Sequence, residues 1–188
     1  MQPSDLPLKK QIFSIPNLLG YFRILILPVI AWLYLTAKEP SDYYLVTGLL
    51  IISSCTDFLD GFIARKFHMV TNLGKILDPI SDKLTQGVLA LCLMSRYKLM
   101  IPLVILFVIK ETYMGIAGLI LVRRKILHGA FWFGKICTAM LDVSIIALII
   151  FPSMPITAVN TIIIICICFM IFSLICYIIK YTKMLRDN

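Results

Sequence analysis

The sequence predicts an all-helical integral membrane protein that crosses the bilayer six times. Its 188 residues are 60% hydrophobic and only 15% charged, and the mean hydropathy is +0.95, values outside the range of soluble globular domains. The apolar residues also fall into six separate runs. Each run is long enough to cross a hydrocarbon core of about 30 Å as a helix.

A helix is the expected conformation of every run, because a helix satisfies its own backbone hydrogen bonds inside lipid. The expected spans are residues 17–37, 43–64, 77–95, 99–122, 134–152 and 156–179. Residues 1–14 form a juxtamembrane segment, in which Lys9 and Lys10 beside apolar residues predict a short amphipathic surface helix. No internal repeat or linker interrupts the chain, so residues 1–188 are expected to form one domain.

Lysine and arginine are divided unevenly between the two expected sides of the membrane. The N-terminal segment, the even-numbered loops and the C-terminal segment carry twelve of them, and the opposite loops carry only Lys38, Arg96 and Lys98. Because these residues are enriched on the cytoplasmic side, both termini are expected to be cytoplasmic, in the cytoplasmic membrane of a bacterium. The net charge of +8 then reflects topology and contact with anionic lipids. Nucleic-acid binding is not expected, since no basic stripe interleaved with aromatic residues is present.

Four of the ten acidic residues lie within 26 residues, where the second expected span meets the third. Asp57 and Asp60 are three apart and share one helix face, and Asp78 and Asp82 are four apart and share another. Pro79 indicates that the third span begins near Asp78 or is kinked there. If the two helices are neighbours, four carboxylates converge just inside the cytoplasmic face. Without positive charge among them, that arrangement would be prohibitively costly.

Divalent cations are the expected counter-charge of these four aspartates. The alternative is a buried ion-pair network with Lys83 and Arg65, although two flexible cations cannot satisfy four clustered acids. Carboxylate oxygens without His or Cys favour Mg²⁺ or Mn²⁺ over zinc. Four carboxylates around two ions form the arrangement used for in-line displacement at phosphorus. The cluster therefore predicts a two-metal site for phosphoryl transfer.

Small residues and an arginine accompany the aspartates. Gly61, Ala64 and Gly74 would allow close approach of a substrate, although small residues also serve helix packing. Arg65 offers the planar fork that suits a phosphate group. Together these residues point to a substrate that contains a diphosphate.

The spacing of these residues resembles the signature of the CDP-alcohol phosphotransferase family. That signature is Asp57-x-x-Asp60-Gly61-x-x-Ala64-Arg65, eight residues, and then Gly74-x-x-x-Asp78-x-x-x-Asp82. The segment IPNLLGYFRILILP at 15–28 is similar to the first span of the family, with Asn17 and Arg23 in the characteristic places. Lys110-Glu111 and FGKICTA at 133–139 resemble segments of its fourth and fifth spans.

The resemblance implies an enzyme that transfers the phosphoryl group of a CDP-linked lipid or alcohol to an acceptor hydroxyl and releases CMP. Asp57, Asp60 and Asp78 would ligate two ions, and Asp82 would share in metal binding and act as the general base. A homodimer is also expected from the resemblance. The residues expected to contact CDP are Asn17, Arg23, Gly61, Ala64, Arg65, Thr71 and Gly74.

The acceptor is less clearly marked than the donor. Similarity to the phosphatidylglycerophosphate synthases favours CDP-diacylglycerol as donor and glycerol 3-phosphate as acceptor. Cations expected to bind that acceptor are Lys110, Arg123, Arg124 and Lys135. Lys110 and Glu111 are adjacent, so they are expected on different faces of the helix.

Three features depart from the synthase pattern, the first being Lys110-Glu111 where the pattern has Arg-Glu. Cys137 stands where the pattern has a lysine, and the apolar segment AGLIL at 117–121 stands where it has an arginine. Cardiolipin synthases of the same family, whose acceptor is phosphatidylglycerol, often lack the same cations and are the alternative. A cation transporter that uses the aspartate cluster is an alternative of another class. It is disfavoured because the acids gather at one membrane face rather than at the midplane.

Overall fold

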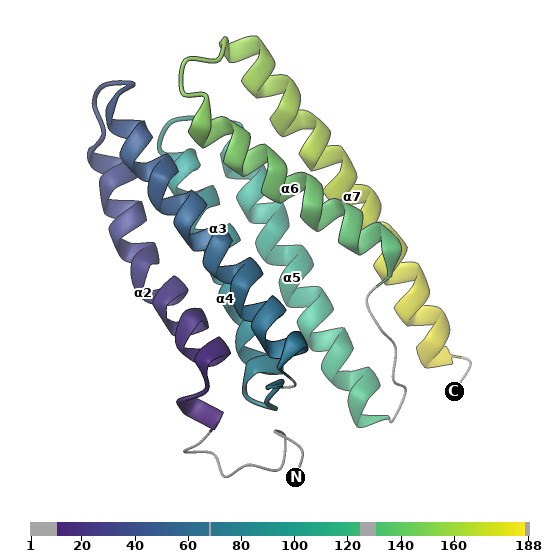
Figure 1. The fold of residues 1–188 in the computed structure, drawn as a ribbon. Coiled ribbons are helices and arrows are strands. Elements are labelled where there is room, and N and C mark those ends of the chain that lie inside the picture. The colour runs from purple at the N-terminus through teal and green to yellow at the C-terminus, as the bar shows by residue number, and fades with distance from the viewer. Residues whose placement is uncertain (1–10, 68, 125–130, 187–188) are drawn as a thin grey trace. The chain divides into compact units, whose positions relative to one another are not determined.

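The computed structural model describes residues 11–67, 69–124 and 131–186, and within them every regular element is a helix (Figure 1). The helices are α2 (Ile15–Thr36), α3 (Asp42–Lys66), α4 (Gly74–Met94), α5 (Met100–Arg123), α6 (Trp132–Ile150) and α7 (Ile156–Arg186). Each predicted span corresponds to one of them, and α7 continues past the predicted end at residue 179. The all-helical class is therefore confirmed. The predicted surface helix falls largely on residues 1–10, outside the described residues.

Among the described helices, five are long and apolar enough to cross a membrane: α2, α3 as far as Ala64, α5, α6 and α7. The exception is α4, because its first ten residues include Lys75, Asp78, Asp82 and Lys83. The sequence and these helices support a membrane protein. The count of six spans stays a prediction that depends on α4.

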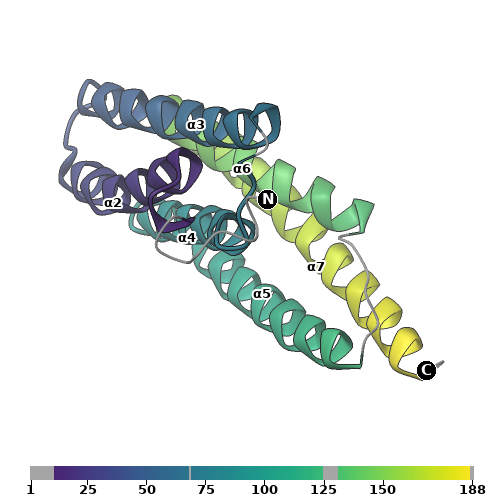
Figure 2. The same ribbon diagram turned by 60° about the horizontal axis from the view of Figure 1, so that its bottom comes forward.

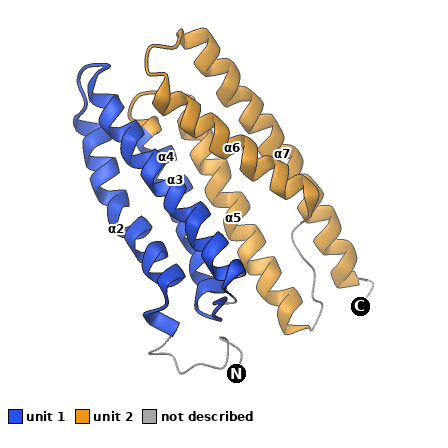
Figure 3. Ribbon diagram, in the orientation of Figure 1, with its two compact units in different colours: residues 1–92 blue, residues 93–188 orange. Residues whose placement is uncertain are grey.

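The chain divides into two compact units, Met1–Cys92 and Leu93–Asn188, shown in different colours in Figure 3. In the first unit, α2 and α3 form a hairpin and lie side by side (Figures 1 and 2). In the second unit, α7 packs against both α5 and α6. The prediction of one domain stays a prediction.

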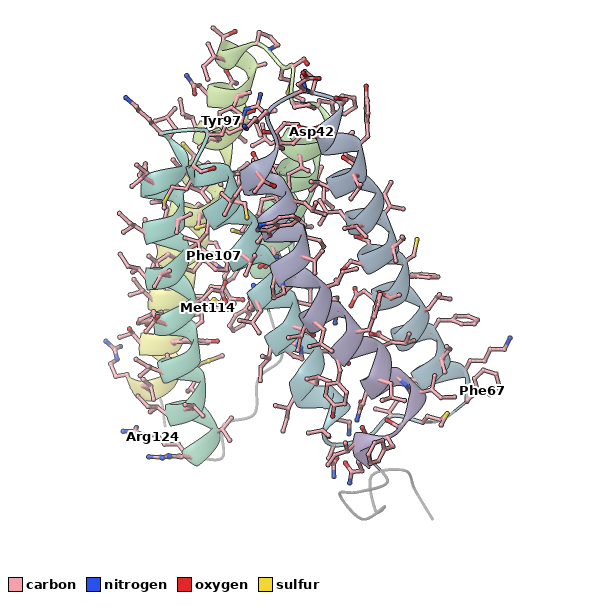
Figure 4. The ribbon with its side chains drawn as sticks, turned by 90° about the vertical axis from the view of Figure 1, so that its left-hand side faces the viewer. Asp42, Phe67, Tyr97, Phe107, Met114 and Arg124 are labelled. Carbon is pink, nitrogen blue, oxygen red and sulfur yellow. The ribbon has the colours of Figure 1, made fainter. Side chains whose placement is uncertain are left out.

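The helices present large apolar side chains on their exposed surfaces, as lipid-facing helices require. On α5, Ile101, Ile105 and Ile116 are each about half exposed. Side chains radiate along the whole course of α5, which passes Phe107 and Met114 on the way to Arg124 just past its end (Figure 4). The same view marks the two ends of α3 by Asp42 and Phe67.

The start of α4 lies three residues before the expected start at residue 77. The helix begins at Gly74, and Pro79 lies inside it rather than at its first position. The hydroxyl oxygen of Thr71 accepts a hydrogen bond of 3.0 Å from the Gly74 amide. The first amides of a helix have no partner within the helix, and the Thr71 hydroxyl accepts a hydrogen bond from one of them. This contact therefore stabilises the start of α4 at Gly74.

Candidate active site

Two aspartates of the motif lie against one buried arginine of α2. The Arg23 side chain is only 4% exposed, and its Nη1 forms ion pairs with Asp57 of α3 and with Asp82 of α4, the latter at 2.9 Å. Its Nη2 donates a hydrogen bond of 2.7 Å to the Ser81 hydroxyl. A single guanidinium therefore joins the three helices of the first unit.

The other two aspartates line a small open pocket in the same unit, with a cavity volume of about 20 Å³. Asp60 is 5% exposed, and its Oδ2 has no hydrogen-bond partner among the described residues. Asp78, which belongs to α4, lines the same pocket. The wall contains six residues that the sequence placed in the site: Asn17, Asp60, Ala64, Thr71, Gly74 and Asp78.

A buried polar network holds the N-terminal end of α2 to the start of α4. Asn17 is 1% exposed, and its Nδ2 donates hydrogen bonds to the Gln11 carbonyl at 2.7 Å and to Thr71 Oγ1 at 3.1 Å. The Gln11 side chain accepts a hydrogen bond of 3.2 Å from the Leu73 amide. Asn17 and Thr71 therefore build the pocket wall, and their predicted contact with CDP stays a prediction.

Gly74 lies against this polar network, which leaves little room for a side chain at position 74. A Cβ built on Gly74 would lie 2.8 Å from Asn17 Oδ1 and 3.1 Å from Thr71 Oγ1. The first distance is shorter than real Cβ contacts allow, so a larger residue would displace Asn17. The polar network itself therefore favours glycine at this position.

The remaining residues of the motif belong to α3. Gly61 follows Asp60 and is half-buried, and Ala64 lies one turn further on the pocket wall. Arg65 lies in α3, but its side chain is outside the described part of the structure. Its predicted contact with the diphosphate stays a prediction.

The four cations predicted to bind the acceptor all belong to the second unit. Lys110 is 2% exposed, and its Nζ contacts Glu111 Oε1 at 2.8 Å, although adjacent residues lie on different faces of a helix. The flexible side chains bridge the angle between adjacent positions. Arg123 and Lys135 are exposed, and Arg124 donates a hydrogen bond of 3.4 Å to the Leu185 carbonyl. Their role toward an acceptor stays a prediction.

Residues 13–179, which include all four aspartates, match the sequence profile of one family, described as CDP-alcohol phosphatidyltransferase. This chain belongs to that family. The match covers most of the sequence, including α2, α3 and α4, and it favours the enzyme over the transporter interpretation.

Several relatives carry names for the same type of reaction. A protein of Aquifex aeolicus named CDP-diacylglycerol--glycerol-3-phosphate 3-phosphatidyltransferase is 32% identical over 136 residues, which is 71% of this chain and 74% of the relative. A Rickettsia typhi protein of the same name is 40% identical over 83 residues, 44% of this chain and 46% of the relative. A Schizosaccharomyces pombe protein named cardiolipin synthase (CMP-forming) / mitochondrial hydrolase fusion protein is 39% identical over 97 residues, 50% of this chain and 15% of the relative. The chain thus spans less than half the length of the last two.

CDP-alcohol phosphatidyltransferases are generally metal-dependent, and the donor atoms at this site fit a divalent ion. The unpaired Asp60 oxygen is buried beside Asp78, an arrangement that a hard cation would stabilise. Asp57 and Asp82 each give Oδ1 to Arg23, and their side chains are 46% and 51% exposed. No group of three or more Asp, Glu, His or Cys residues is close enough to hold an ion in the described part of the chain. Binding two ions therefore requires the exposed carboxylates to turn toward Asp60.

Sequence reasoning missed the counter-charge within this family site. Divalent cations were the expected counter-charge and an ion-pair network with Lys83 and Arg65 was the alternative, whereas Arg23, expected to contact CDP, pairs with Asp57 and Asp82. Lys83 donates a hydrogen bond of 3.2 Å to Gln86. The available signal was an arginine inside a long apolar run, because a charge at such a position is rarely without a partner. Ser81, which binds the same guanidinium, carried no signal in the sequence.

Proposed function

We propose that this chain transfers the phosphatidyl group of CDP-diacylglycerol to the hydroxyl of glycerol 3-phosphate, with release of CMP. The observation that carries the proposal is the pocket in which buried Asp60, with its unpaired oxygen, faces Asp78 beside Asn17 and Thr71. Family membership supports the reaction type, and the names of the Aquifex and Rickettsia relatives support this acceptor.

A diacylated donor suits the surroundings of the pocket. Phe58 and Phe62 lie on α3 beside the aspartates, stack on each other at 6.4 Å between ring centroids, and are 69% and 43% exposed. Exposed aromatic side chains on a membrane helix contact lipid. The nucleotide headgroup of the donor would therefore enter the polar pocket while its acyl chains stay in the bilayer.

Asp82 is the proposed general base of the reaction. Its Oδ1 accepts a hydrogen bond from Arg23, and its side chain is 51% exposed, so Oδ2 would be the oxygen that receives an acceptor hydroxyl. That oxygen would take the hydroxyl proton as the acceptor attacks the phosphorus that bears diacylglycerol. A new P–O bond forms, the bond from this phosphorus to the bridging oxygen breaks, and CMP leaves with that oxygen. Bound divalent ions would neutralise the charge that develops on the leaving CMP.

The finer features of the site belong to the same proposal. Asp57, Asp60, Asp78 and Asp82 would hold two Mg²⁺ or Mn²⁺ ions, and Gly61, Ala64 and Arg65 would line the path of the diphosphate. The excess of lysine and arginine on one set of loops supports a cytoplasmic site with both termini on that side. The resemblance to the family supports a homodimer.

An acceptor screen with the purified chain tests the proposal. CMP release from CDP-diacylglycerol and Mg²⁺ is measured with glycerol 3-phosphate, phosphatidylglycerol, inositol phosphate or serine as the acceptor. We expect the fastest release with glycerol 3-phosphate, its loss in a chelator and its recovery with Mg²⁺ or Mn²⁺. Absence of CMP with every acceptor would contradict the enzyme assignment.

Phosphatidylglycerol is the second candidate acceptor. Lys110 is engaged by Glu111, and buried Cys137 stands where the synthase pattern has a lysine, so fewer cations are available to a soluble phosphate. The name of the S. pombe relative points in the same direction. Faster CMP release with phosphatidylglycerol than with glycerol 3-phosphate would establish this alternative.

A further inference from the structure

We propose that Arg23 is a built-in counter-cation of the aspartate site, which balances Asp57 and Asp82 in the metal-free protein and competes with divalent ions for them. This inference rests on the proposed function, because it takes the aspartates as metal ligands. It differs from the CDP contact that the family resemblance implies for Arg23. A residue that binds the nucleotide acts on substrate affinity, whereas a counter-cation acts on metal affinity before any substrate is present.

The position of Arg23 requires a strong electrostatic reason. The residue lies within α2, a helix of high hydropathy, and its side chain is 4% exposed. A guanidinium keeps its proton in proteins, so Arg23 cannot become neutral to lower the cost of burial. Negative partners must therefore be part of its environment, and Asp57 and Asp82 supply them.

The contacts of Arg23 fit a charge held at a fixed point. Nη1 contacts one carboxylate from α3 and one from α4, and Nη2 is anchored on Ser81, which is fully buried. The Ser81 hydroxyl also lies 2.8 Å from the Leu77 carbonyl, so the anchor is itself held by the backbone of α4. Arg23 Nε is buried and has no hydrogen-bond partner among the described residues. The ion pairs with Asp57 and Asp82 therefore hold the Arg23 guanidinium, although its hydrogen-bonding capacity is not fully used.

Competition with metal follows from the same contacts. Arg23 pairs with Asp57 and with Asp82, the proposed general base. Both carboxylates are partly exposed, so a divalent ion can reach them. A divalent ion that binds these carboxylates meets a resident positive charge, and like charges at close range repel. Arg23 and the ion compete for the same carboxylates, so each weakens the interaction of the other with them. Loss of the arginine charge should therefore tighten metal binding and weaken the metal-free protein.

The test measures Mn²⁺ binding to the detergent-solubilised chain by electron paramagnetic resonance, without CDP-lipid. We expect Arg23→Gln to lower the Mn²⁺ dissociation constant by at least about fivefold, within the usual range of coupling between sites. The rise in melting temperature on adding Mn²⁺ should also be larger in Arg23→Gln than in the parent chain, since a lower dissociation constant gives more stabilisation at the same Mn²⁺ concentration. Arg23→Lys, which keeps the charge, should bind Mn²⁺ within about twofold of the parent chain.

Two further variants keep the result interpretable. Ser81→Ala removes only the anchor of the guanidinium, should tighten Mn²⁺ binding by a smaller factor, and serves if Arg23→Gln does not fold. Arg96→Gln is the matched loss of one positive charge, because Arg96 lies in the second unit and contacts the Pro152 carbonyl. It should leave Mn²⁺ binding unchanged.

The outcomes separate this inference from the proposed function. If the parent chain binds Mn²⁺ and releases CMP but Arg23→Gln and Ser81→Ala bind Mn²⁺ equally or more weakly, the counter-cation role is wrong and Arg23 instead orients the ligands or binds substrate. If the parent chain binds no Mn²⁺ and releases no CMP, the proposed function itself is wrong. Tighter binding in both variants with Arg96→Gln unchanged supports the inference.

Discussion

Replacement of Gly74 by alanine probes the junction between α2 and α4 with a single methyl group. The added Cβ would lie 2.8 Å from Asn17 Oδ1, so Asn17 must move. Asn17 is buried and bonded to Gln11 and Thr71, and any shift weakens those bonds. Overpacking of a filled site costs about 1–3 kcal/mol, and alanine regains up to about 1 kcal/mol of helix propensity. We expect a net loss of about 1–2 kcal/mol.

The assay is thermal unfolding of the detergent-solubilised protein, followed by intrinsic fluorescence. For a chain of this size, the expected loss corresponds to a melting temperature lower by about 2–8 °C. Gly48→Ala is the matched control, because a Cβ on Gly48, in the interior of α3, meets nothing within 4 Å. That control should be neutral or slightly stabilising, since alanine is favoured over glycine inside a helix.

A double substitution locates the cause. In an Asn17→Ala background the crowding atom is gone, so Gly74→Ala should cost clearly less than in the parent chain, and the difference measures the coupling of the two positions. The reasoning is refuted if Gly74→Ala is as stable as Gly48→Ala. In that case the glycine would be small only to admit substrate, and the change would appear as a raised KM for CDP-diacylglycerol.

Three more substitutions address single roles at the site. Asp82→Asn should slow CMP release by about 10²-fold or more, because loss of a general base has that effect; full turnover would exclude the role. Asp60→Asn removes the charge of the buried carboxylate whose Oδ2 is unpaired among the described residues, and should weaken Mn²⁺ binding by about tenfold or more. Binding is measured by electron paramagnetic resonance, and unchanged binding would show that Asp60 is not a metal ligand. Thr71→Val deletes the hydroxyl that caps α4 and should cost about 0.5–2 kcal/mol in thermal unfolding, whereas Thr71→Ser should not; equal stability of the two would show that the cap contributes nothing.

Helix positions were predictable because hydropathy is a local property of the chain. The predicted end of the second span at residue 64 and the start of the fifth at residue 134 lie within two residues of the ends of α3 and α6. The spacing of Asp57 and Asp60 on one helix was predictable for the same reason, since helical geometry alone sets it. At α4 the expected start, residue 77, lies three residues after the observed one, Gly74, whose amide donates a hydrogen bond to the Thr71 hydroxyl.

Contacts between helices could not be predicted from the sequence in the same way. The ion pair of Arg23 with Asp57 depends on the packing of α2 on α3, and the bond from Asn17 to Thr71 joins residues 54 positions apart. Side-chain length misled the interpretation of Lys110, which reaches Glu111 although the two Cβ atoms point in different directions. The residue types of the site were therefore visible in the sequence, while their partners were not.

The helix that contributes Asp78 and Asp82 is also the helix least suited to lipid. Ionisable residues within a membrane helix cost roughly 2.5–3.5 kcal/mol each near its centre, and less toward its ends. In α4 the four charged residues are confined to the first half, and the second half, which ends at Met94, carries no charged residue. The charged half is the part that α2 contacts through Asn17, near its start, and through Arg23, whose guanidinium binds Ser81 and Asp82. The proposed reaction uses carboxylates of α4, and polar groups from the neighbouring apolar helix α2 offset the cost of placing those charges beside apolar helices. The same contacts that make the site chemically useful therefore also make α4 stable in its position.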